Sequence, residues 1–144
     1  MPSDDTIKLL KECNAGVKTA VSSFDEVIDH IQDPKLKNLI VNSRMEHEKI
    51  GDETHKLLVV NEDDDKEPNP VAKAMSWMKI NGKLMMQNKD ATVADLITDG
   101  CNMGVKSVCR YMNQYKTAND EAKTYAERLV RLEEKLMQDL RAYL

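Results

Sequence analysis

The chain has 144 residues, of which 32% are charged, 41% are hydrophobic and only 4% are aromatic. A formal net charge of -4 without any basic cluster argues against nucleic-acid binding, which requires a concentrated cationic surface to neutralise phosphates. Apolar runs are far shorter than a membrane span, the acidic start has no apolar segment behind it, and the three cysteines lack paired spacing. We therefore expect a cytoplasmic protein with reduced thiols, neither inserted in a membrane nor secreted.

The first part of the chain predicts a helical hairpin over residues 4–60. Apolar side chains recur at three- and four-residue steps from Asp4 to Ile31, which is typical of a helix with one buried stripe. Asp33 and Pro34 then supply an N-cap followed by proline at the first helical position, and a second helical pattern continues to Val60. The short turn between two long helices makes them antiparallel.

A long connection over residues 61–90 follows this hairpin. It begins with an acidic stretch, which we interpret as a solvated linker because it lacks the glycine and the ligand spacing of a calcium loop. Asn69 and Pro70 repeat the N-cap and proline signal, and they predict a shorter helix from Val71 to Gln87.

Residues 91–144 predict a second hairpin. Thr92 and Asp95 resemble a capping box at the start of a third long helix, and a polar turn around Asn119 leads to a fourth. The sequence shows no alternating strand pattern, so the expected fold class is all-α. Two hairpins joined by a long crossover predict one four-helix bundle domain over residues 1–144, with the second and third long helices parallel.

The two hairpins share a motif near their starts. Glu12–Thr19 returns as Gly100–Ser107, with cysteine, asparagine, glycine, valine and lysine in register, so the chain reads as one hairpin used twice. A glycine costs a helix interior about 1 kcal/mol relative to alanine. Gly16 and Gly104 therefore predict a close approach of the helix backbone to a neighbour at both matched positions.

The other residues of this motif lead to two expectations. Asn14 and Asn102 are predicted to hydrogen-bond across the pseudo-twofold axis and to fix the register of the bundle. Cys13 and Cys101 have no histidine beside them, so we expect them to be small buried apolar residues.

A hairpin, a long crossover and a second hairpin is the topology of ferritin-like proteins. The sequence also resembles a bacterial ferritin-like domain family of unknown function. This resemblance lies in Asp33–Leu39, in Met75–Lys79 and in the segments around Gly16 and Gly104. It spans nearly the whole chain, and it implies the bundle fold and a history of metal binding.

A ferritin-like di-iron centre uses a glutamate from each of two helices and a Glu-x-x-His motif from each of the other two. Because that centre lies on the pseudo-twofold axis, its acids should recur in both copies of the repeat. The register instead pairs Glu12 with Gly100, and it pairs His47 with Glu133. We therefore interpret the chain as having lost the di-iron ligand set.

A displaced metal site on the second helix is the alternative. Its candidate ligands are Glu46, His47, Glu53 and His55. A solvated, charged helix face is the simpler interpretation of the same residues.

The predicted crossover helix holds the candidates for an interaction surface, which are Met75, Trp77, Met78 and Met85. Methionine repacks easily against different partners, although core packing explains such a cluster as well. The sequence thus predicts a non-catalytic binding or interaction module without a cofactor, which pairs with a protein partner or with itself as a homodimer. The alternative is a metal-binding ferritin-like protein that holds iron or another transition metal and has ferroxidase or oxidoreductase activity.

Overall fold

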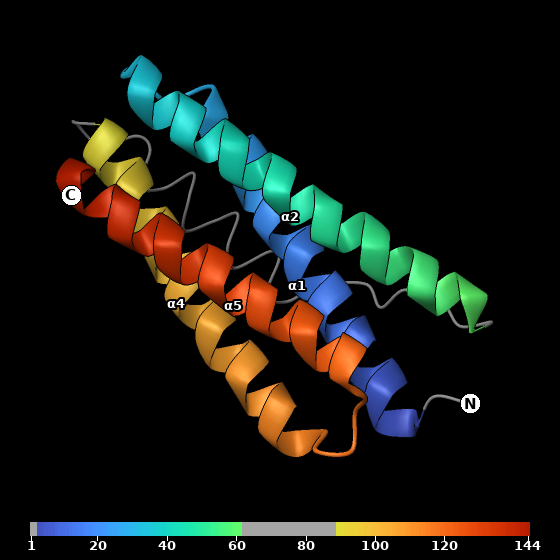
Figure 1. Cartoon of the computed structure of the whole chain (residues 1–144). Helices are drawn as coiled ribbons and strands as arrows, with labels where there is room; N and C mark the ends of the chain where they lie inside the picture. Colours follow the sequence, from blue (N-terminus) through green and yellow to red (C-terminus); the bar gives the residue numbers. More distant parts are fainter. Residues whose placement is uncertain (1–2, 62–88) are drawn as a thin grey trace.

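The computed structural model describes residues 3–61 and 89–144, which form four long helices and a short terminal turn (Figure 1). They are α1 (Asp4–Ile28), α2 (Pro34–Val60), α4 (Lys89–Gln114), α5 (Asp120–Leu140) and the 3-10 turn η1 (Arg141–Tyr143). These two ranges contain no strand, so the all-α prediction is confirmed. The predicted crossover helix, with Met75, Trp77, Met78 and Met85, lies outside the described residues.

Side-chain caps explain where three of the helices begin. Ser3 accepts a hydrogen bond from the backbone of Thr6, Asp33 from Lys35, and Asn119 from Ala122. Pro34 follows its cap at the first position of α2, as the sequence predicts.

Two predicted helix ends are wrong. α1 stops at Ile28 and not at Ile31, because the chain already turns towards the cap at Asp33. α4 is helical from Lys89, so Thr92 lies inside the helix and is not its N-cap.

The two hairpins pack face to face, with α1 against α4 and α2 against α5. At one end of the bundle, the Asp90 carboxylate accepts hydrogen bonds from the backbone of Gln32 (2.7 Å) and Asp33 (3.0 Å). The start of α4 therefore lies beside the start of α2, and these two helices run in the same direction (Figure 1). The predicted parallel arrangement is confirmed.

The bundle has two apolar clusters rather than one continuous core. The turn cluster lies near the α1–α2 turn and includes Phe24, Leu36, Ile40, Cys101 and Leu136. The terminal cluster lies near the start of α1 and includes Leu9, Cys13, Ile50, Leu58 and Leu129. Both clusters draw on all four helices, so the hairpins are held together on both sides of the bundle centre.

Candidate functional site

Between the two clusters, the centre of the bundle is polar. On α2, His47 lies between Ile40 of the turn cluster and Ile50 of the terminal cluster. On α5, Glu133 lies between the two clusters in the same way. His47 is 0% exposed and Glu133 is 5% exposed, so both ionisable side chains are closed off from solvent. Histidine and glutamate are rarely this buried without a role or a partner.

The imidazole of His47 is held by its own helix. Its Nδ1 lies 2.7 Å from the backbone oxygen of Ser43, one turn earlier, so Nδ1–H donates to that carbonyl. Its Nε2 faces Glu133, with 3.6 Å between Nε2 and Oε1. Phe24 packs edge-on against the ring, with 5.1 Å between the centroids. Nε2 of His47 and Oε2 of Glu133 are buried and have no hydrogen-bond partner.

Gly104 makes room for the Glu133 carboxylate. A Cβ atom at this position would collide with both carboxylate oxygens. At the matched position Gly16, a Cβ would only reach ordinary contact with Leu129, at 3.8 Å. The predicted close approach is therefore present at Gly104, where the neighbour is a side chain, and absent at Gly16.

Burial sets the protonation of the groups around the centre. It raises the pKa of Glu133, an effect that the neighbouring His47 opposes. Burial, together with Glu12 and Glu133, raises the pKa of Cys13 to about 12. Burial and Glu133 also raise the pKa of Cys101. Both thiols are thus protonated at neutral pH and cannot serve as thiolate nucleophiles.

The four candidate metal ligands do not come together. His47 lies at the centre of the bundle, whereas His55 is exposed. Glu46 pairs with Lys49 at 3.0 Å, and Glu53 pairs with Arg128 at 2.8 Å. Within residues 3–61 and 89–144, no three histidine, cysteine or acidic side chains are placed to hold a metal ion. One carboxylate and one imidazole also do not fit the ferritin-like di-iron ligand set.

The predicted pairing of Asn14 with Asn102 is wrong. Asn14 is buried, and its Nδ2 donates to the backbone oxygen of Gly51 (3.1 Å) and to Oγ1 of Thr54 (3.2 Å). It therefore ties α1 to α2 within the first hairpin, whereas Asn102 is exposed on α4. The expectation that Cys13 and Cys101 are buried is confirmed, since they are 1% and 4% exposed.

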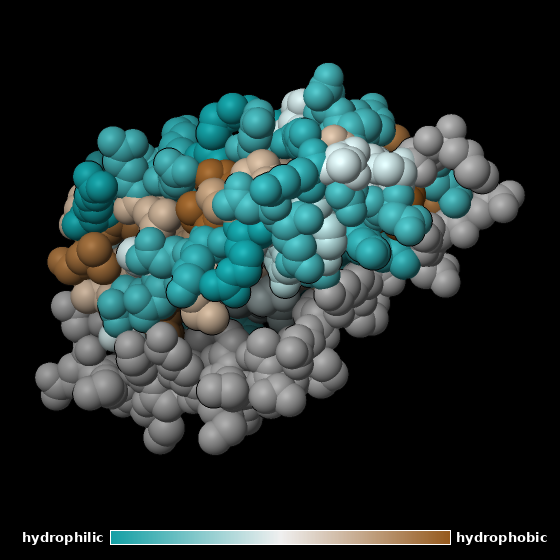
Figure 2. Space-filling view, turned by 90° about the horizontal axis from the view of Figure 1, so that it is seen from below, coloured by the Kyte–Doolittle hydropathy of each residue, from teal (hydrophilic) through white to brown (hydrophobic). Residues whose placement is uncertain are grey.

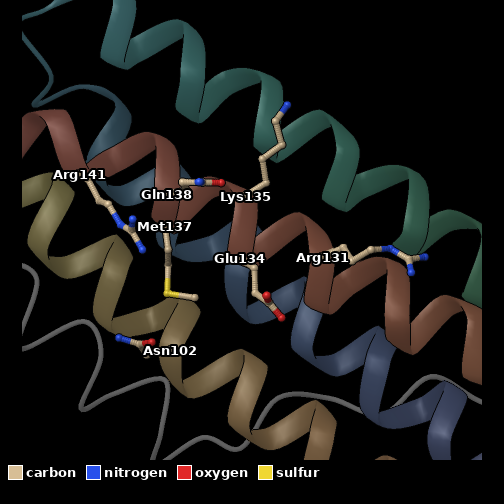
Figure 3. A pocket seen from close by; sticks show the side chains of 7 residues that line it. All are labelled: Asn102, Arg131, Glu134, Lys135, Met137, Gln138 and Arg141. Atoms are coloured by element: carbon tan, nitrogen blue, oxygen red, sulfur yellow. The ribbon is translucent and has the colours of Figure 1, made fainter.

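Asn102 contributes to an open basin of about 650 Å³ on the outer face of α4 and α5 (Figure 3). The residues that line the basin are Asn102, Arg131, Glu134, Lys135, Met137, Gln138 and Arg141. Three of these side chains are cationic and one is acidic, so the basin has a net positive charge. It contains no histidine or cysteine, and its residues form no nucleophile–base pair.

Glu133 is a functional candidate that the sequence alone did not predict. The available signal was an acidic residue in phase with the apolar stripe of its helix, at the position that the repeat pairs with His47. The sequence predicted a close approach at Gly104 because this residue lacks a side chain. It did not predict that the Glu133 carboxylate fills the space.

No protein-family model matches the chain, and no curated protein matches it. Among solved structures, it is similar to a DUF305 fragment from Deinococcus radiodurans, with a TM-score of 0.76 and 10% sequence identity. The match covers 98% of this chain and 95% of the other, so it extends over the whole bundle. At this identity, the similarity shows the fold alone. None of the described helices is long and apolar enough to cross a membrane.

Proposed function

We propose that the chain is a non-catalytic ferritin-like bundle that acts as a binding or interaction module in the cytoplasm. The ferritin-like assignment is supported by the parallel α2 and α4 and by the long connection between them. One observation carries the functional part of the proposal. The centre of the bundle contains a buried His47–Glu133 pair in place of a set of convergent carboxylates.

A closed centre is a poor place for catalysis. A substrate must reach the reacting groups, and neither His47 nor Glu133 is accessible from outside. Cys13 and Cys101, which lie within the apolar clusters, are protonated and equally enclosed. These four buried groups therefore serve the interior of the bundle, and we expect recognition at the outer surface.

The basin on α4 and α5 is the part of this surface best suited to a protein partner. Its cations Arg131, Lys135 and Arg141 complement an acidic partner surface, and such complementarity speeds association and fixes orientation. The face in Figure 2 is mainly hydrophilic, with only scattered hydrophobic residues among the described atoms. A second copy of this acidic chain is the proposed partner, so that the module is a homodimer.

Sedimentation velocity tests the interaction. We expect a dimer whose dissociation constant rises at least tenfold in the double variant Arg131→Glu/Lys135→Glu. The matched control is Lys35→Glu/Lys37→Glu, which makes the same charge change at exposed positions on α2 and should leave the dimer intact. A monomer at all concentrations, or equal weakening by both variants, would contradict the proposed role of the basin.

Metal analysis tests the non-catalytic assignment. Protein purified without a chelator or an affinity tag should contain no stoichiometric metal, and it should not accelerate the aerobic oxidation of added Fe(II). Stoichiometric iron or another transition metal would instead support the alternative, a metal-binding ferritin-like protein with an unconventional site. Iron oxidation that disappears in His47→Ala/His55→Ala would do the same.

A further inference from the structure

We propose that Glu133 and His47 share one proton and form a pH-sensitive latch between the two hairpins. Nδ1–H of His47 is already committed to the backbone oxygen of Ser43 at 2.7 Å, which leaves Nε2 as a hydrogen-bond acceptor. Beside a neutral imidazole, an ionised Glu133 would place a second acceptor 3.6 Å away, with no donor between them. The other arrangement, an imidazolium that donates from Nε2 to a carboxylate, would bury two charges at once. A proton on the carboxyl group resolves this conflict, because its O–H can donate to Nε2 after a small side-chain rotation.

The surroundings of the pair favour the neutral, protonated carboxyl group. The thiols of Cys13 on α1 and Cys101 on α4 are protonated, because burial and Glu133 raise their pKa values, and Glu12 raises that of Cys13 further. From α1, the edge of Phe24 adds an apolar wall beside the imidazole. The cation-forming group beside this carboxyl group is His47, which opposes the effect of burial on its pKa. A carboxylate here would be nearly dry and without a fixed positive partner, which is costly.

The pair joins the hairpins at their midpoint. His47 belongs to α2 of the first hairpin and Glu133 to α5 of the second. Gly104 of α4 leaves the space that the Glu133 carboxyl group fills, and the apolar clusters lie on both sides of this position along α5. Loss of the shared proton would leave an unpaired negative charge between the two apolar clusters, and the hairpins would separate more readily.

The direction of the pH effect follows from the raised affinity of Glu133 for its proton. In the unfolded chain, this carboxyl group loses its proton near its ordinary pKa of 4.5, whereas burial raises that pKa in the folded chain. The contribution of the protonated Glu133 to the free energy of unfolding is therefore complete below about pH 4.5. It is lost as the pH rises through the raised pKa of the folded chain. One retained proton corresponds to about a tenfold change in the unfolding constant per pH unit in that interval.

Urea unfolding of the full chain between pH 5 and pH 8 tests the latch. The wild-type unfolding constant, divided by that of Glu133→Gln, should rise by up to about tenfold per pH unit, because the amide cannot ionise. Glu134→Gln is the matched control, since it removes the same charge from the neighbouring exposed position and should follow the wild type. An equal pH dependence in wild type and Glu133→Gln would overturn the proposal.

A spectroscopic measurement on the wild-type chain keeps the test decisive if Glu133→Gln does not fold. Infrared spectra near neutral pH should show the carbonyl stretch of a protonated carboxylic acid. Glu26→Gln, which removes the other carboxyl group whose pKa is raised by burial, should retain this band. The same band should disappear as the pH is raised, together with faster amide hydrogen exchange in α2 and α5. A folded wild-type chain without this band at pH 6 would overturn the proposal.

Discussion

The two repeat glycines show how far matched residues can differ in their surroundings. At Gly104 the missing side chain provides the space that the Glu133 carboxyl group occupies, whereas Gly16 has Leu129 at ordinary contact distance. The backbone of both glycines is helical, so neither needs its conformational freedom. The two positions differ in what an added methyl group would contact, which is the Glu133 carboxyl group at Gly104 and Leu129 at Gly16.

Alanine substitutions at these glycines should therefore have opposite effects on stability. Gly16→Ala should stabilise the chain by about 0.5–1 kcal/mol, because alanine favours the helix and fits beside Leu129. Gly104→Ala should destabilise it by about 1–3 kcal/mol, since the new Cβ collides with Glu133. Urea unfolding measures both values.

The double variant Gly104→Ala/Glu133→Ala serves as the control for the collision. Its loss of unfolding free energy should be smaller than the sum of the losses in the two single variants, because the truncated side chain no longer meets the new methyl group. Strict additivity of the two single changes would show that the cost of Gly104→Ala arises elsewhere.

At the scale of the helices, local signals predicted most of the architecture. Periodic apolar residues identified all four described helices, and Asp33 with Pro34 marked the start of α2. Helix length and turn length then implied the hairpins and the parallel α2 and α4. The end of α1 at Ile28 and the helical residues before Thr92 were missed, since helix termini depend on backbone hydrogen bonds that sequence periodicity does not report.

The site was less predictable because the two halves of the repeat are not packed equivalently. α1 contacts α2, α4 and also α5 across the diagonal, while α2 and α4 are the less closely packed diagonal pair. α1 is thus more enclosed than α4. Asn14 is buried for this reason, while its repeat mate Asn102 is exposed. A repeat in sequence predicts equal folds for its copies but not equal environments.

The N-terminus of α1 is tied to the turn between α4 and α5 by hydrogen bonds of Ser3, Thr6 and Asp5, of which only Asp5 contributes a charge. Asp5 Oδ2 accepts hydrogen bonds from the backbone N–H of Thr117 (3.0 Å) and from its hydroxyl group (2.6 Å). These bonds lower the pKa of Asp5 below its ordinary 3.8. The tie therefore stabilises the folded chain above about pH 3.8, and its contribution is lost as the pH falls through the lowered value.

Asp5→Asn should accordingly reduce stability at pH 6 and make the remaining stability less sensitive to acid. Asparagine keeps an acceptor oxygen, but it cannot form the charge-assisted bonds to Thr117. Circular dichroism during titration from pH 6 to pH 2 measures the effect. Asp4→Asn is the control at the adjacent exposed position. If both variants follow the same acid transition, the hydrogen bonds from Thr117 to Asp5 do not stabilise the folded chain in this specific way.

For the whole molecule, the main question is whether the two apolar clusters unfold together. The polar layer at His47 and Glu133 separates them, but every helix passes through both. Cys13 reports on the terminal cluster and Cys101 on the turn cluster, and the two thiols belong to different hairpins. Cys109 is only half-buried and provides an internal reference.

Thiol labelling can therefore measure the cooperativity of the bundle. In native protein at pH 8, an alkylating reagent should modify Cys109 first, since Cys13 and Cys101 are buried and their pKa values are raised. Modification of these two should then proceed at one common rate, equal to that of global opening, because all four helices contribute to both clusters. Mass spectrometry of the labelled peptides gives each rate, and Cys109→Ser removes the fast background. Labelling of Cys13 well before Cys101, or the reverse, would instead show that the bundle opens one cluster at a time along the polar layer.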